Sequence, residues 1–134
     1  MSALRSEASH PDIVSESAPV TRSATRPIVP ERLESRVIIV TGVVYARSDN
    51  LDAVLALSLE HVRRSRGEPG CLLHSVHQDV EDPLRVVFLE HWADRAALAT
   101  HFGVAESRTF ATEVTGLAAR PPVMDIYEAE TVRL

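Results

Sequence analysis

The chain has 134 residues, 45% of them hydrophobic, which is enough for one hydrophobic core and short for two. The formal net charge is −5 and all 14 basic residues are arginines, with no cluster larger than the three within residues 63–66. A nucleic-acid or anionic-membrane surface is therefore not expected, because both partners require a basic patch. No apolar run approaches the ~18 residues of a membrane span, and the first residues lack the apolar stretch of a secretory signal. The single Cys71 cannot form an internal disulfide, and we expect a buried thiol in a cytoplasmic protein.

The first 35 residues differ in character from the rest. Residues 1–35 contain seven serines and four of the eight prolines, without lasting helical or strand periodicity. Such a segment cannot bury enough apolar surface to offset its ordering entropy. We predict a flexible arm over 1–35 and a folded domain over 36–134, and a plain extension is favoured over a regulatory or targeting segment.

The folded region opens with a strand and a helix. Residues 36–46 are rich in β-branched side chains and predict a strand. Asp49 is the predicted N-cap of the following helix, which ends at Gly67. Its apolar face repeats at helical spacing through Leu51, Val54, Leu55, Ser58 and Val62.

The remaining elements complete a known topology. Residues 71–79 and 84–92 predict two strands, and the short turn between them makes an antiparallel hairpin. Asp94 can then cap a helix, and a second helical stretch ends at Pro121. The stripe of the capped helix consists of Leu98, His101, Phe102 and Ala105. With a last strand over 123–131, the order is β-α-β-β-α-β, which predicts an α+β, ferredoxin-like fold.

Both faces of the predicted sheet are apolar. The alternating positions of the first strand are Val37, Ile39, Val43 and Tyr45 on one face, and Ile38, Val40 and Val44 on the other. Helices in this fold cover only one face, and a domain of this size has no element left for the second. We therefore predict a homodimer that packs sheet to sheet.

Strand alternation also groups the polar residues. Glu90 and Trp92 share a face with Val86 and Phe88, whereas His91 lies on the opposite face. His101 lies on the apolar stripe of its helix, His61 lies near the stripe of the first helix, and His74 shares a face with Leu72 and Val76. If helices cover the face of Glu90, the converging candidates are His61, His74, His101, Glu90, Trp92, and either Tyr45 or Thr41.

This constellation has three interpretations. A buried acid and base must pair or line a polar pocket, since stranding a polar group costs roughly 1–3 kcal/mol. Each histidine alone is more simply a hydrogen-bonded core residue, but the group with a tryptophan wall suits a small aromatic ligand. A metal site of two histidines with Glu90 is a weaker alternative, and His74 and His77 point to opposite faces of a strand. We expect no metal or cofactor.

Several segments resemble the antibiotic biosynthesis monooxygenase domain family, which includes quinol-oxidising members. They are Glu68-Pro69-Gly70-Cys71-Leu72, the run from Val86 to Asp94, the pair Ala97-Leu98, His101 and Phe110. The resemblance covers about residues 36–130. It implies a dimeric α+β barrel with a pocket between helices and sheet, and oxidation of phenols or quinols by molecular oxygen without flavin, haem or metal.

On this resemblance the roles are assigned as follows. His101 is the base that deprotonates the phenol, Glu90 orients or charges His101, and Trp92 is the stacking wall. The residues expected to bind the substrate are His61, His74, Phe88, Leu98 and Phe102. Haem-degrading relatives need an asparagine on the first strand, and residues 37–46 contain none. Two alternatives stay open: a non-oxidative small-molecule binder or isomerase that uses the same pocket, and a structural dimer with no cavity.

Overall fold

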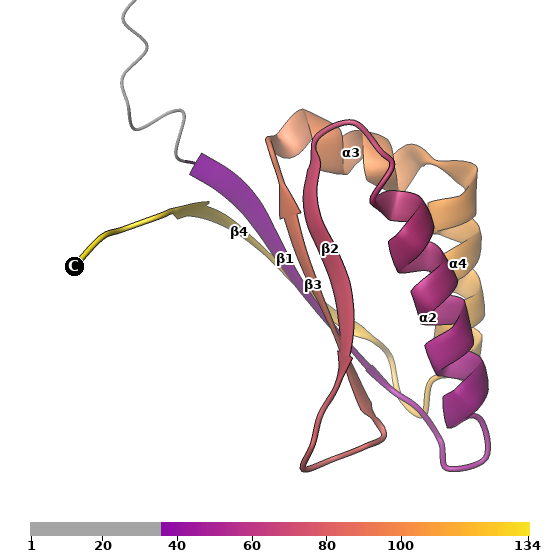
Figure 1. The fold of residues 1–134 in the computed structure, drawn as a ribbon. Coiled ribbons are helices and arrows are strands. Elements are labelled where there is room, and N and C mark those ends of the chain that lie inside the picture. The colour runs from indigo at the N-terminus through magenta and orange to yellow at the C-terminus, as the bar shows by residue number, and fades with distance from the viewer. Residues whose placement is uncertain (1–35) are drawn as a thin grey trace, which may run out of the picture.

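A computed structural model describes residues 36–134, so the predicted arm over 1–35 lies outside the described residues. The elements are β1 (Arg36–Tyr45), α2 (Leu51–Ser65), β2 (Cys71–Gln78), β3 (Arg85–Trp92), α3 (Arg95–Gly103), α4 (Ala105–Leu117) and β4 (Val123–Glu130). The strands form one antiparallel sheet in the order β2-β3-β1-β4. All three helices lie on one side of this sheet (Figure 1). The predicted α+β, ferredoxin-like topology is confirmed.

The helices cover the sheet face that carries Glu90 and Trp92. On β3, Val86, Phe88, Glu90 and Trp92 are buried, while the residues between them are only half-buried. On β1 the buried set includes Ile38, Val40 and Val44. Thr41 and Tyr45 belong to the opposite set, so their candidate place beside the histidines was wrong; Tyr45 instead lies under the guanidinium of Arg120, 3.5 Å from its ring centre.

The hydrophobic core has two parts. The first part is built from Val44, Ala46, Val54, Val62, Val86, Phe88 and Val114. The second is built from Ile38, Val40, Trp92 and Leu98. Along β3, Phe88 belongs to the first part and Trp92 to the second, and Glu90 lies between them. The two apolar parts of the core are therefore separated along β3 by the buried polar side chain of Glu90.

The first turns of α3 and α2 differ in how they are capped. Asp94 accepts a hydrogen bond from the backbone N–H of Ala97 at 2.8 Å, which confirms the predicted cap of α3. The predicted cap of α2 by Asp49 was wrong: Asn50 occupies the N-cap position and makes no side-chain capping bond. Asn50 instead donates to the carbonyl of Leu117 at 2.8 Å, and thereby ties the β1–α2 loop to the end of α4.

Strand β2 starts with an irregularity that alternation could not predict. The pairing with β3 changes register between Cys71 and Leu73, because Leu72 is an extra residue. Leu72 is 58% exposed, so its predicted place on the face of His74 was wrong. Cys71 turns to the helix side and packs against the part of the core that contains Trp92.

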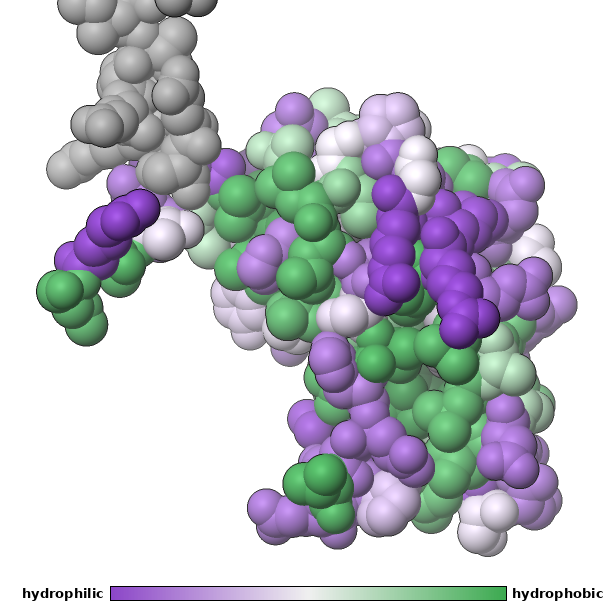
Figure 2. Space-filling model, viewed as in Figure 1, coloured by the Kyte–Doolittle hydropathy of each residue, from purple (hydrophilic) through white to green (hydrophobic). Residues whose placement is uncertain are grey.

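The outer face of the sheet and strand β4 carry exposed apolar side chains. On β4, Val123, Met124, Ile126 and Tyr127 are each more than half exposed, and no helix covers the end of this strand (Figure 1). Hydrophobic side chains also reach the surface over the upper part of the sheet (Figure 2). None of the described helices is both long and apolar enough to cross a bilayer.

Candidate active site

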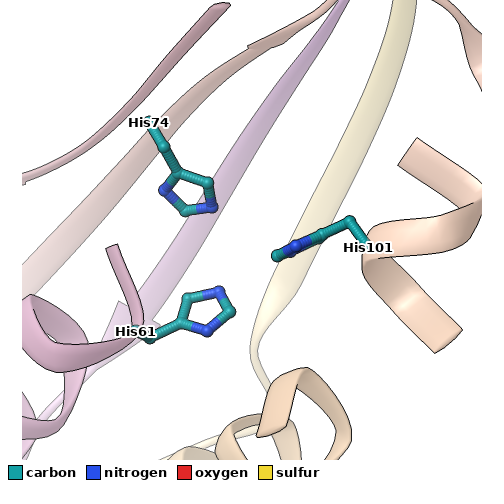
Figure 3. A group of neighbouring side chains, drawn as sticks. All are labelled: His61, His74 and His101. Carbon is teal, nitrogen blue, oxygen red and sulfur yellow. The ribbon is translucent and has the colours of Figure 1, made fainter. Parts of the chain in front are cut away.

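Three histidines from three different elements meet between the helices and the sheet. His61 comes from α2, His74 from β2 and His101 from α3, and their rings converge on one space (Figure 3). The ring centres lie 5.2 Å apart for His61 and His74, 5.3 Å for His61 and His101, and 5.6 Å for His74 and His101. Each histidine is at most 6% exposed. The structure thus brings all three predicted histidines together.

His101 is held by an acid that the sequence did not single out as a site residue. Nδ1 of His101 lies 2.5 Å from Oε2 of Glu68, which follows the end of α2. The other carboxylate oxygen of Glu68 accepts from Nη1 of Arg64 at 3.3 Å. Since a carboxylate only accepts, Nδ1 of His101 donates, and in the neutral form of this imidazole the lone pair is on Nε2.

Glu90 has different partners from the one predicted. Nε1 of Trp92 donates to Oε2 of Glu90 at 2.7 Å, and Oε1 lies 3.5 Å from Nε2 of His74 without hydrogen-bond geometry. Glu90 therefore makes no hydrogen bond to His101. Burial raises the pKa of Glu90, and the nearby charge of Glu68 acts in the same direction, against the hydrogen bond from Trp92.

The other two histidines are kept neutral. Burial, then the neighbouring His74, His101 and Arg64, lower the pKa of His61 to about 3. Burial, then His101 and the two arginines Arg66 and Arg64, lower the pKa of His74 to about 4. Nη2 of Arg64 lies 3.0 Å from Nδ1 of His61, and because arginine only donates, His61 carries its proton on Nε2.

A cavity of about 190 Å³ opens beside the histidines, between β1, β4 and the helices α3 and α4. Phe88, Phe110 and Met124 supply apolar lining, and His61, Glu90 and His101 supply polar lining. Phe110 stacks on the ring of His61, with ring centres 3.9 Å apart and planes inclined by 5°. The hypothesis of a packed module without a cavity is therefore not supported.

The predicted site residues take different places around this cavity. His61, Phe88, Glu90, His101 and Phe102 line it. Phe102 is 38% exposed, so it belongs to the rim instead of the core stripe on which it was predicted. His74, Trp92 and Leu98 are buried behind the lining, and Trp92 packs against His101 with ring centres 4.6 Å apart.

The site also contains residues that were missed as candidates, among them Arg64, Glu68, Phe110 and Met124. Glu68 and Phe110 lie within the segments that carry the family resemblance, and that was the available signal for them. No sequence pattern pointed to Arg64 or Met124, because their places in the site depend on how α2 and β4 pack.

The fold and the site define a small α+β domain with an acid and base cluster beside a mostly apolar cavity. The sequence profile of the family named "antibiotic biosynthesis monooxygenase" matches residues 37–113. The chain is also 35% identical over 98 residues to the protein sll1783 of Synechocystis sp., covering 72% of this chain and 67% of that protein, which is described as uncharacterised. This chain belongs to the antibiotic biosynthesis monooxygenase family.

Solved structures agree with the fold. An antibiotic biosynthesis monooxygenase structure is 28% identical and superposes with a TM-score of 0.65, covering 70% of this chain and 99% of the other. The protein Rv0793 of Mycobacterium tuberculosis is 23% identical, with a TM-score of 0.67 and coverage of 72% and 97%. At this identity the second likeness concerns the fold alone.

Proposed function

We propose that this chain is a cofactor-independent monooxygenase that oxidises a quinol, phenol or polycyclic aromatic with molecular oxygen. The observation that carries the proposal is that His101, whose Nδ1 is paired with Glu68, lines a mostly apolar cavity. Family membership supports the reaction class, and the aromatic lining supports an aromatic substrate.

His101 is the proposed base. Its Nε2 takes the proton of the substrate hydroxyl, and Glu68 stabilises the imidazolium that forms, since the carboxylate already accepts from Nδ1. The electron-rich phenolate gives one electron to O₂, and the two radicals combine to a peroxide at a ring carbon that bears hydrogen. Loss of water from this peroxide leaves a quinone. One oxygen atom enters the substrate, the other leaves as water, and the proton on His101 returns in that water.

Binding in the cavity contributes by restricting motion. Phe88 and Phe110 offer faces against which an aromatic ring can pack, and the apolar surroundings keep the radical pair together until it combines. Trp92 acts from behind His101, where it holds the imidazole in place instead of touching the substrate.

The working unit that we propose is a homodimer formed through the outer sheet face. Val37, Ile39, Val43, Val87 and Leu89 are half-buried on that face, although no element of the described residues covers it. The end of β4 and the start of β1 extend beyond the helix layer (Figure 1). A second copy of the sheet would remove this apolar surface from water.

Oxygen consumption tests the proposed reaction. A panel of naphthols, hydroquinones and anthrones should include a substrate that supports oxygen uptake, and His101→Ala should lower that uptake at least about tenfold because base catalysis contributes a factor of this size or more. The exposed His77 provides a matched control, since His77→Ala leaves the cavity unchanged. Circular dichroism checks that both variants fold. Equal uptake by wild type and His101→Ala would exclude His101 as the base.

A non-oxidative binder or isomerase is the second candidate function. It is favoured by the two histidines that line the cavity, His61 and His101, because imidazoles at a cavity can transfer protons to and from a ligand without any oxidant. Thermal stabilisation by a panel compound without oxygen uptake would support this candidate against the first.

A further inference from the structure

We propose that His61, His74 and His101 form a binding site for one divalent transition metal ion of the Zn²⁺, Co²⁺ or Cu²⁺ class. This inference does not rest on the proposed oxidation. A metal ion would take the lone pair on Nε2 of His101 that the oxidation uses, so metal binding and base catalysis exclude each other.

The geometry of the three rings supports a metal. One nitrogen from each ring can be chosen so that all three lie within 4.8 Å of one another. The centre of such a triangle is at most about 2.8 Å from each nitrogen, and Zn–N bonds are about 2.0–2.1 Å long. Ring movements of less than about 1 Å would therefore complete the coordination. Three histidines with an open fourth position are a known arrangement for a catalytic zinc ion.

His74 supplies an independent observation. It is 2% exposed, and neither of its ring nitrogens makes a hydrogen bond among residues 36–134. Buried polar atoms without a partner are rare, and each requires a reason. A metal ion at the shared space would give Nε2 or Nδ1 of His74 the partner that the protein does not provide.

The surroundings of the rings resemble those of known metal ligands. Metal-binding histidines usually donate their second N–H to a carboxylate or carbonyl oxygen, and Nδ1 of His101 already lies 2.5 Å from Glu68. Glu90 lies 3.5 Å from His74 and adds a second carboxylate beside the site. The cavity lined by His61 and His101 provides a route of entry and an open position for water or another ligand.

Arg64 opposes metal binding by His61, and this gives a specific prediction for a variant of Arg64. Because Arg64 donates to Nδ1 of His61, the proton of that imidazole is on Nε2, the nitrogen that faces the cluster. A metal can bind Nε2 only after this proton moves to Nδ1 and the bond from Arg64 is lost. Replacing Arg64 by glutamine, whose carbonyl oxygen can accept from Nδ1–H, should therefore tighten metal binding.

Cobalt binding to the metal-stripped full chain tests the site. Co²⁺ should bind with one equivalent per chain and develop the intense visible bands of a tetrahedral or five-coordinate nitrogen site. His74→Gln and His61→Gln should each weaken binding at least about tenfold, and Arg64→Gln should strengthen it several-fold. A variant with His10, His77 and His91 all replaced by glutamine keeps the site and should bind like wild type.

A second measurement keeps the test independent of variant folding. Zn²⁺ should raise the Tm of wild type but not of His74→Gln, because a ligand that binds only the folded state stabilises it. The absence of visible bands with wild type, equal Co²⁺ affinity in His74→Gln, or weaker binding in Arg64→Gln would each overturn the inference. Oxygen uptake is not used in either measurement, so failure here does not bear on the proposed monooxygenase.

Discussion

At the scale of single residues, the two charged neighbours give His61 and His101 opposite proton positions. Glu68 accepts from Nδ1 of His101 and leaves a lone pair on its Nε2, whereas Arg64 donates to Nδ1 of His61 and leaves a proton on its Nε2. Toward the space between the rings, His101 therefore presents an acceptor and His61 presents a donor. Glu68 and Arg64 also contact each other, at 3.3 Å, so the tautomers of His101 and His61 are coupled.

Glu68→Gln should separate the orientation of His101 from its presence. A glutamine can present either its oxygen or its amide group to Nδ1, so the tautomer with a lone pair on Nε2 is no longer favoured. We expect the rate of oxygen uptake to fall about a hundredfold or more, as for other acid and histidine pairs. The ¹⁵N chemical shifts of His101 should report the change of tautomer. An unchanged spectrum together with an unchanged rate would remove Glu68 from the mechanism.

The pairing of His101 with Glu68 could not be predicted from the sequence. The two residues are 33 positions apart, and Glu68 lies in a loop, where neither helical nor strand periodicity fixes the direction of a side chain. Glu90 was the natural candidate, because strand alternation placed it on the correct face. Alternation decides which face a side chain occupies, but it does not decide which neighbour it contacts.

Cys71 should be a slow nucleophile. Burial raises the pKa of its thiol, and the carboxylates of Glu68 and Glu90 act in the same direction. At pH 8 the folded protein therefore holds less thiolate than an unfolded chain does. Alkylation by iodoacetamide, followed by mass spectrometry, should be at least about tenfold slower in the folded protein than in urea, and the folded rate should rise with pH above 9. Cys71 is only half-buried, not fully buried as predicted, and equal rates in the two states would mean that this partial burial does not protect the thiol.

At the scale of elements, α3 is the helix that brings His101 over the sheet, and its start is fixed by two contacts. Asp94 caps its first turn, and the carbonyl of Gly70 accepts from the N–H of Ala93 at 2.8 Å. Gly70 has φ of +81°, and a Cβ at this position would lie 2.5 Å from the Cβ of Ala97. The close approach of the β2 start to α3 therefore requires glycine.

The capping difference between α3 and α2 gives a matched pair of variants. Asp94→Ala removes the acceptor for the N–H of Ala97 and should lower the free energy of unfolding by about 1 kcal/mol. Asp49→Ala should change it much less, because Asp49 caps no helix and makes only an exposed contact of 3.5 Å with Arg47. Urea unfolding measures both variants. Equal losses would mean that Asp49 contributes to α2 after all.

Element order and strand faces could be predicted because they depend on local periodicity. The alternation in 84–92 correctly separated Glu90 and Trp92 from His91, and the helical spacing correctly placed His61 and His101 toward the sheet. The prediction failed at Leu72, where one extra residue in β2 reverses the alternation. A bulge has no fixed sequence pattern, since it depends on the pairing of two strands.

At the scale of the whole molecule, the helices protect one face of the sheet and leave the other face uncovered among residues 36–134. Leu89 lies near the middle of β3 on the uncovered face, opposite Thr41 of β1 and Ser75 of β2. The apolar side chains around it are the surface that the proposed homodimer would bury.

Leu89→Arg should therefore convert the proposed dimer to a monomer. A buried guanidinium without a partner is costly, so we expect the dimer dissociation constant to rise at least about a hundredfold. Size-exclusion chromatography with light scattering measures the mass of both forms. Ala56→Arg, on the exposed side of α2, is the matched control and should stay dimeric. A monomeric wild type, or a dimeric Leu89→Arg, would contradict the proposed interface.

The extra residue at Leu72 also determines which single-residue deletions strand β2 can accept without moving its side chains to the other face of the sheet. Because Cys71 and Leu73 pair with the adjacent residues Trp92 and His91, loss of Leu72 would leave a regular ladder in which every neighbour keeps its face. Loss of Ser75 would instead turn the whole stretch before it over, and His74 would point away from His61 and His101. Relatives that differ from this chain by one residue at the bulge can thus keep the three-histidine cluster, whereas a single deletion a few positions later removes it without any substitution of a histidine.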